Sequence, residues 1–149
     1  SVLRAQLFNT LLADRVAAGD WNRVVAGDIC ILQGTRSQFS CEQPDAVIGQ
    51  RCAEGDLHPA LPLWGSGLDD RPTASLQRWQ SALAQHQDAA RFLVEQGLEC
   101  SWRPARLLAD DFYWEFCDDK TLQLVFRLGA GSYATALLAE FVRYNQPQA

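Results

Sequence analysis

Hydrophobic positions at the start of the chain recur every three or four residues, as they do along one face of an amphipathic helix. The repeating positions are Leu3, Leu7, Phe8, Leu11, Leu12 and Val16. Gly19 follows the last of them and supplies a stop signal, because glycine is common just after a helix ends. The pattern therefore predicts a helix that runs up to Gly19 and turns one apolar face toward a core.

Shorter apolar runs replace this helical period beyond Gly19. Val24–Val25 and Ile29–Leu32 flank an Ala-Gly-Asp turn signal, and Gly34 opens another turn before Phe39. This texture predicts a small β hairpin.

Proline and glycine residues mark the boundaries of the elements expected in the middle of the chain. Residues 44–56 read as a short helix with Gly55 just past its end. Residues 57–72, LHPALPLWGSGLDDRP, are dense in both residue types and predict a long loop. Thr73 or Ser75 then caps a long helix that ends at Gly97. Its apolar face carries Leu76, Trp79, Leu83, Ala90 and Leu93.

The pattern changes again near Leu108. Aromatic-rich residues 113–117 and a second run with Leu122, Leu124 and Phe126 on one face surround an Asp-Asp-Lys turn, which predicts a hairpin. A closing helix is expected from about Ser132 through Tyr144. A two-stranded hairpin with one helix buries too little surface to fold alone. This tail should therefore complete a sheet, supplied either by the first part of the chain or by something that the chain lacks.

Composition narrows the classes of protein. The 149 residues make one ordinary domain or two small ones, and 48% hydrophobic content is enough for a core. A net charge of −5 argues against a protein that coats nucleic acid, although it leaves room for a local RNA site. No signal peptide or membrane-length apolar run is present, so we expect a soluble, cytoplasmic chain. The chain has no methionine and opens in full helical pattern, as a piece of a longer protein would.

Most side chains that could carry chemistry have a plain structural interpretation. The five cysteines show no C-x-x-C spacing, which favours reduced, small hydrophobic residues over zinc or redox motifs. Neighbouring carboxylates on a strand point to opposite faces, so paired acids are better read as solvated turns. Such pairs are Asp69–Asp70, Asp110–Asp111 and Asp118–Asp119. Gly65 and Gly67 lack the residues that would make a phosphate loop.

The candidate site is the turn between the last strand and the last helix. It consists of Gly129, Ala130, Gly131, Ser132 and Tyr133. Its small residues would let a ligand approach the backbone, and Ser132 could cap a helix whose first amides favour a phosphate. Tyr133 could stack on a base, an interaction of about 1–3 kcal/mol. The spacing equally allows a plain strand-to-helix turn with a tyrosine in the core. Basic residues placed to meet an RNA backbone, by position only, are Arg103, Arg106, Arg127 and Arg143.

The segment LVFRLGAGSYATALLAEF resembles the C-terminal motif of the TruD-type tRNA pseudouridine synthases, in which Leu-Pro-Ala-Gly-Ser-Phe precedes Ala-Thr and a helix. Other segments resemble that family in the same order. They are the R-x-x-L-F-N core at residues 4–9, the Val-x-Gly-Asp hairpin at residues 25–28, the loop HPALPLWGSG and the hairpin WEFCDDKTLQLVF. The resemblance covers nearly the whole chain.

This resemblance implies an α+β protein in two parts. Residues 1–108 would form most of a helix-rich insertion domain with a small β hairpin. Residues 109–149 would supply a strand-strand-helix unit that completes the mixed sheet of the catalytic domain.

The implied reaction isomerises uridine, at position 13 of tRNA, to pseudouridine without a metal or an organic cofactor. Tyr133 would stack on the flipped base, with Ser132, Gly131 and Ala130 shaping the turn. Gly129 stands where the family has proline, which would loosen that turn.

The family's catalytic aspartate lies in a Gly-x-Lys-Asp motif that is absent here, so no residue of this chain is assigned that role. The resemblance implies that the N-terminal half of the enzyme supplies it, that this chain alone is inactive, and that the whole protein is a monomer that binds tRNA and no membrane. The alternative is a non-catalytic RNA-binding or interaction domain.

Overall fold

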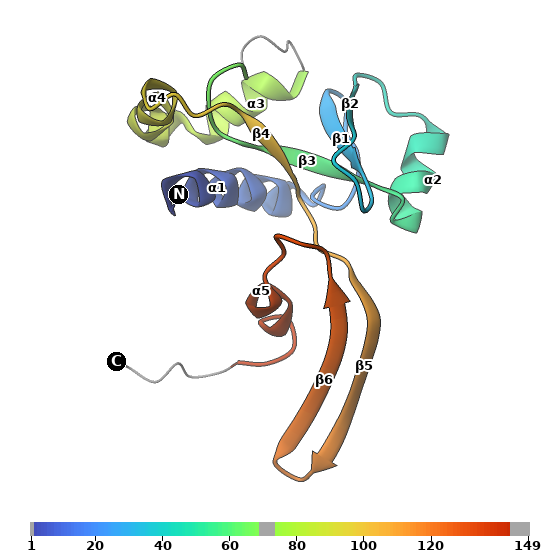
Figure 1. Cartoon of the computed structure of the whole chain (residues 1–149). Helices are drawn as coiled ribbons and strands as arrows, with labels where there is room; N and C mark the ends of the chain where they lie inside the picture. The colour runs from blue at the N-terminus through green and yellow to red at the C-terminus, as the bar shows by residue number, and fades with distance from the viewer. Residues whose placement is uncertain (1, 69–73, 144–149) are drawn as a thin grey trace. The chain divides into compact units, whose positions relative to one another are not determined.

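The protein is described by a computed structural model of residues 2–68 and 74–143. The chain divides into two compact units, Ser1–Arg106 and Leu107–Ala149. Helices and antiparallel sheets occur together, which confirms the predicted α+β class (Figure 1). The assignment of the two parts to an insertion domain and a catalytic domain stays a prediction.

The first unit is built on a four-stranded antiparallel sheet in the order β2-β1-β3-β4. Its strands are β1 (Asp28–Leu32), β2 (Gln38–Cys41), β3 (Leu57–Leu63) and β4 (Ser101–Pro104). Its helices are α1 (Val2–Ala18), α2 (Ala46–Glu54), α3 (Ala74–Ala82), the 3₁₀ turn η1 (Ala84–His86) and α4 (Gln87–Glu95). The expected small hairpin is therefore only half of a larger sheet.

The core of this unit lies between the sheet and helices α1, α3 and α4. Leu7 and Leu11 of α1 are buried against Ile29 and Leu61 of the sheet and against Trp79 of α3. The predicted helix at the start of the chain is confirmed, and Gly19 follows it with a φ of +69°. Val16 belongs to the predicted apolar face but is 55% exposed, so the buried stripe ends one turn earlier.

The predicted hairpin is displaced along the sequence. Val24–Val25 is not a strand, and the hairpin forms between β1 and β2, with Gly34 in the connecting turn. Val25 instead lies in a turn whose backbone N–H donates to Asp28 Oδ2 at 2.8 Å. The short helix is confirmed as α2, with Asp45 as N-cap and Gly55 in the left-handed conformation after it.

The loop predicted for residues 57–72 is wrong over its first half, which forms the central strand β3. The prolines are tolerated because each falls where a strand partner ends. The Asp56 carbonyl accepts from Gln33 on the β1 side, and the Pro59 carbonyl accepts from Ala105 on the β4 side, so successive residues of β3 face alternate neighbours. Pro62 therefore faces β1 beyond the last paired residue, Ala60. The nitrogen of Pro59 likewise faces β4 beyond its last paired residue.

The predicted long helix is interrupted. It consists of α3 and α4, separated by η1, and Gly97 follows α4 with a φ of +71°. Ser75 lies inside α3 as a buried residue and not as its cap, while Thr73 lies outside the described residues.

The second unit contains a two-stranded antiparallel sheet and a short helix. The strands are β5 (Ala109–Asp118) and β6 (Thr121–Leu128), which confirms the predicted hairpin, and the helix is α5 (Ala134–Leu138). The closing helix is thus much shorter than predicted, and its expected end at Tyr144 lies outside the described residues. Within residues 2–68 and 74–143, no helix is long and apolar enough to span a membrane.

Candidate functional site

The turn that follows β6 has a defined backbone geometry. The Ser132 N–H donates to the Gly129 carbonyl at 3.1 Å, which closes a four-residue turn. Its third residue, Gly131, has a φ of +84°, as a type II turn requires. A Cβ atom at either glycine would meet no atom within 4 Å. Conformation explains Gly131, and the space beside Gly129 is open.

Tyr133 lies at the end of this turn and is 63% exposed. Within the described residues, Tyr133 is therefore not part of a core. Tyr133 itself is the N-cap residue of α5, so the expectation that Ser132 caps this helix is wrong. Because α5 has five residues, its dipole offers little attraction to an anion. What the turn presents to solvent is an aromatic ring.

The hairpin that leads into this turn has one apolar face. Trp114 lies opposite Leu124, and Phe116 lies opposite Leu122, so alternate positions on both strands are apolar. Trp114 and Phe116 are 55% and 69% exposed. Sheets normally cover such a face.

Aromatic stacking covers one end of this apolar face. The ring of Phe112 stacks on Phe126, with centroids 6.3 Å apart, and on Phe141 from the segment after α5, at 5.2 Å. Trp114 and Phe116 meet edge to face at 5.9 Å nearer the hairpin tip. The second unit therefore covers its own sheet near Phe112 and leaves the tip exposed.

The opposite face of the hairpin is more polar, although it includes Val125. Tyr113 lies opposite Val125, and Glu115 lies opposite Gln123. The Tyr113 hydroxyl donates to Glu115 Oε2 at 2.7 Å, and this bond raises the pKa of the tyrosine. One face of the sheet thus suits water or a polar partner.

Asp111 is the one described non-glycine residue with a positive φ, at +50°. It lies in a bulge of β5, between the pairs Asp110–Arg127 and Tyr113–Val125. Its Oδ2 atom accepts from the Arg127 guanidinium at 2.5 Å, and both side chains are largely exposed. Aspartate tolerates this conformation better than most residues. The bulge therefore brings the carboxylate of Asp111 to Arg127, whose partner in the ladder is the preceding residue, Asp110.

Arg106 is held inside the first unit. Its Nε donates to His58 Nδ1 at 2.8 Å, and its terminal nitrogens donate to the carbonyls of Asn22, Cys52 and Leu57. These bonds join the end of β4 to three other segments. They account for Arg106 without RNA.

The same contacts define the state of His58, which is buried. Because arginine can only donate, Nδ1 must accept from Arg106, and the proton lies on Nε2, which donates to Gln33 Oε1 at 2.5 Å. Burial, and then the charge on Arg106, lower the pKa of His58, against the attraction of Asp56. His58 is therefore a neutral structural histidine, and sequence spacing gave no sign of its partners.

The other two predicted basic residues differ in surroundings. The Arg103 guanidinium lies 5.3 Å from the centroid of the Phe8 ring, a cation–π contact within the first unit. Arg143 is exposed, near the end of the described residues. The structure does not bring Arg103, Arg106 and the turn residues together within one unit.

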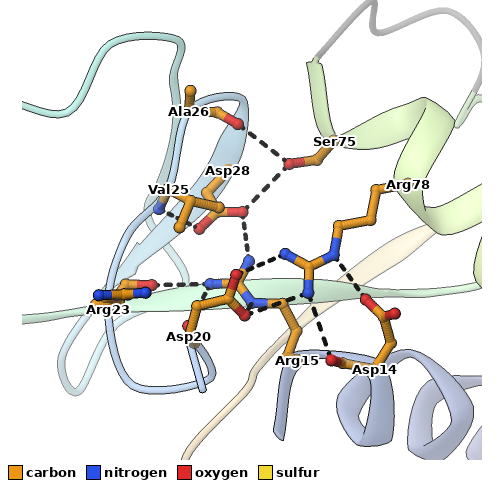
Figure 2. A network of polar contacts seen from close by, with 9 residues as sticks. All are labelled: Asp14, Arg15, Asp20, Arg23, Val25, Ala26, Asp28, Ser75 and Arg78. Carbon is orange, nitrogen blue, oxygen red and sulfur yellow. Dashed lines mark hydrogen bonds and ion pairs between the residues drawn. The ribbon is translucent and has the colours of Figure 1, made fainter. Parts of the chain in front are cut away.

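A buried ion-pair network lies within the first unit (Figure 2). Arg15, 1% exposed, donates to Asp28 Oδ1 at 2.7 Å and pairs with Asp20 Oδ1 at 2.9 Å. It also donates to the carbonyls of Asp20 and Arg23. Burial acts to raise the pKa of Asp20, but the hydrogen bond from Arg78 and the charges of Arg15 and Arg78 outweigh it and lower that pKa.

Helix α3 is attached through the same network. Arg78 pairs with Asp14 at 2.6 Å and with Asp20 at 2.7 Å, while the Ser75 hydroxyl donates to Asp28 Oδ1 at 3.3 Å (Figure 2). A Cβ atom at Gly27 would lie 2.6 Å from the backbone nitrogen at the start of α3. Gly27 is needed for this close approach and Asp28 for the charge of Arg15. This pairing explains the Val-x-Gly-Asp pattern structurally.

The cysteines behave as small hydrophobic residues. Cys30, Cys41 and Cys52 are buried in one cluster with Leu57, and none of the five cysteines, all of which lie in the described residues, forms a disulfide. Burial raises the pKa of Cys30 to about 12, so its reactive thiolate is scarce. Among the described residues, no group of three His, Cys, Asp or Glu side chains is arranged to hold a metal ion.

Comparison with known proteins gives a consistent family. The family model described as tRNA pseudouridine synthase D (TruD) matches residues 1–141. A tRNA pseudouridine synthase D from Nitrosococcus oceani is 38% identical over 147 residues, which cover 98% of this chain and 41% of that protein. One from Hydrogenovibrio crunogenus is 35% identical over 140 residues, covering 94% and 40%. The chain therefore spans about two fifths of the length of these relatives.

A solved structure shows the same fold. It is the crystal structure of a Methanosarcina mazei protein described as a tRNA pseudouridine synthase D, with a TM-score of 0.71. The similarity covers 95% of this chain and 37% of that one, at 21% sequence identity.

Proposed function

This chain belongs to the tRNA pseudouridine synthase D (TruD) family, and we propose that it is the C-terminal portion of an enzyme that converts uridine to pseudouridine in tRNA. Residues 1–108 form most of its insertion domain, and residues 109–149 form the end of its catalytic domain. The whole enzyme is a cytoplasmic monomer. The match of the family model over residues 1–141 carries this proposal.

The reaction exchanges one bond of the nucleotide for another. The N1–C1′ bond of uridine 13 breaks, the uracil turns, and a C5–C1′ bond forms as C5 loses its proton and N1 gains one. No redox partner is required. The catalytic aspartate comes from the part of the family's length that this sequence does not span, because the sequence contains no Gly-x-Lys-Asp motif.

Tyr133 holds the everted base. Its ring is exposed, follows a fixed turn and lies on the unit that the chain contributes to the catalytic domain. A flat, apolar surface binds the detached uracil through its face and leaves it able to rotate in its own plane. Ala130, Gly131 and Ser132 keep the approach to that ring uncrowded.

Basic residues contribute less than the stacked ring. Arg127 faces the RNA with Asp111 already bound to it, so its net attraction for a phosphate is small. Arg143 is the better candidate in the second unit for a backbone contact. Arg103 and Arg106 would have to share their guanidinium groups with Phe8 and with the sheet contacts.

A hybrid enzyme tests the proposal. This chain replaces the matching segment of the Nitrosococcus oceani relative, and tritium release from [5-³H]uridine-labelled tRNA measures the loss of the C5 proton. We expect conversion by the hybrid. A folded hybrid that binds tRNA but releases no tritium would contradict the proposal and favour a non-catalytic RNA-binding domain.

Variants at the stacking position sharpen the test. Tyr133→Ala in the hybrid should reduce turnover about 5- to 150-fold, the equivalent of the stacking energy of one base. Tyr133→Phe, which keeps the ring, should retain most activity. Equal losses in both variants would contradict stacking and point to the hydroxyl.

A further inference from the structure

Arg127 and Asp111 form an exposed ion pair at the end of the hairpin that leads to Tyr133. Arg127 is the next-to-last residue of β6, and the turn that ends at Tyr133 follows this strand directly (Figure 1). The Arg127 guanidinium donates to Asp111 Oδ2 at 2.5 Å. An RNA with a base stacked on Tyr133 would bring its backbone to this end of the hairpin. The charge that Arg127 presents there therefore affects how tightly RNA binds.

The bulge in β5 is what makes this ion pair possible. In a regular ladder, Asp110 would share a face of the sheet with its partner Arg127, and Asp111 would point to the other face. That other face is the apolar one, which carries Phe126. Because β5 has one extra residue here, Asp111 takes a φ of +50° and leaves the regular alternation. Its carboxylate thereby lies against Arg127 and not among aromatic rings.

The ion pair contributes little to the stability of the hairpin. The side chains of Arg127 and Asp111 are 69% and 73% exposed, and water screens pairs that are this exposed. The left-handed backbone of Asp111 carries a conformational cost that so weak a pair barely offsets. A larger effect falls on an anion that approaches Arg127. A phosphate that is attracted by the guanidinium is repelled by the carboxylate beside it.

We propose that Asp111 limits the affinity of the site for RNA by cancelling the attraction of Arg127 for phosphate. This inference rests on the proposed function, which brings tRNA to the turn. The reaction exchanges one glycosidic bond and leaves every phosphate unchanged, so a phosphate contact holds product as firmly as substrate. Such uniform binding does not lower the barrier of the chemical step, and it slows the release of modified tRNA. With Arg127 neutralised, the base stacked on Tyr133 contributes a larger share of the binding energy.

Binding of tRNA to the hybrid enzyme, measured by fluorescence anisotropy at several salt concentrations, tests this role. Asp111→Asn keeps the size of the side chain, and asparagine also tolerates a positive φ. At about 0.1 M salt we expect it to tighten binding about three- to fivefold, the effect of one unit charge about 4 Å away in water. The dependence of log affinity on log salt should steepen by about 0.7–0.9, as for one added phosphate contact. The KM for tRNA should fall by a similar factor while kcat does not rise.

Two further variants separate this role from a general loss of negative charge. Asp119→Asn removes the same charge at the hairpin tip, more than a Debye length along the strands, and should change affinity less than about twofold. Arg127→Gln leaves Asp111 uncompensated and should weaken binding about three- to fivefold. The double variant Asp111→Asn with Arg127→Gln replaces one neutral pair by another and should bind like the parent hybrid.

The outcomes separate this inference from the proposed function. In an active hybrid, unchanged or weaker binding by Asp111→Asn would overturn the role of Asp111 and leave the function standing. So would a rise in kcat, or a double variant that binds as tightly as Asp111→Asn alone. A hybrid that shows the expected affinities but releases no tritium would contradict the function and leave the role of Asp111 standing. A folded hybrid that does not bind tRNA would overturn both.

Discussion

Strands β3 and β5 show how differently the two units are completed. Six of the seven residues of β3 are buried, with a neighbour on each side. None of the ten residues of β5 is buried, although its aromatic content is higher. The first unit therefore supplies both the neighbouring strands and the covering layer that its central strand needs. In the described part of the second unit, the apolar face of the sheet stays exposed at Trp114 and Phe116.

The largest effect should come from breaking the buried network of the first unit. Arg15→Ala removes the cation shared by Asp20 and Asp28, and it leaves the fully buried Asp28 carboxylate without an ion-pair partner. We expect a loss of about 3–5 kcal/mol in the free energy of unfolding, measured by urea denaturation. Arg91→Ala removes an exposed pair with Asp88 at 3.8 Å and should cost less than about 0.5 kcal/mol. Similar costs for both variants would contradict the network.

A smaller loss of stability is expected where Gly27 packs against the start of α3. Gly27→Ala forces a Cβ atom to 2.6 Å from backbone, while Gly34→Ala has a similar positive φ but open space. Both variants carry the conformational cost, so their difference reports the clash, roughly 1–3 kcal/mol. Equal stabilities would mean that α3 can move away from Gly27 freely.

The effect of a substitution on the stability of the second unit should depend on whether the rest of the enzyme is present. Trp114→Ser in the 149-residue chain should change stability by less than about 0.5 kcal/mol, because the ring is already exposed. In the hybrid enzyme, where we expect that face to be covered, the same change should cost about 3 kcal/mol. Glu115→Ser, on the polar face, is the control and should be mild in both. Thermal denaturation of the four proteins gives the comparison, and equal effects of Trp114→Ser in both would mean that the face stays uncovered.

The mildest prediction concerns pH and again singles out the first unit. The pKa of His58 is lowered in the folded chain from 6.5, so below pH 6.5 the unfolded chain binds more protons than the folded one. Stability should therefore be full above pH 6.5 and fall as the pH drops toward the folded pKa. Denaturation at a series of pH values should show this slope in the parent and in His86→Gln, and a weaker slope in His58→Gln. An unchanged slope in His58→Gln would assign the effect to other groups.

Sequence patterns predicted the elements whose periods are unambiguous. The amphipathic α1, the capped α2 and the hairpin β5–β6 were visible because apolar spacing and turn residues agree. Strand β3 was missed because two prolines normally argue against a central strand, and only the lengths of its neighbours make them harmless. The break between α3 and α4 was missed because the apolar period continues from Leu76 to Leu93 without a proline or glycine.

The candidate site divides in the same way. An aromatic residue after a glycine turn could be read from the sequence. The exposure of Tyr133, the bulge at Asp111 and the contacts of Arg106 could not, because each depends on how segments distant in the sequence pack together. Adjacent aspartates followed by an aromatic strand were the one signal that could have suggested the bulge.

The two prolines of β3 also help to fix the pairing register of the first unit's sheet. A shift of β1 by one residue relative to β3 would turn its buried side chains to the outer face of the sheet, which would cost the burial of the core. Sliding it by two toward Pro62 would keep every side chain on its proper face, but its end would then meet a nitrogen that carries no hydrogen. Pro59 obstructs β4 in the same manner. A two-residue register shift keeps the alternation of buried and exposed side chains, so the core does not oppose it. The missing N–H of proline does, because the shifted strand would lose a backbone hydrogen bond.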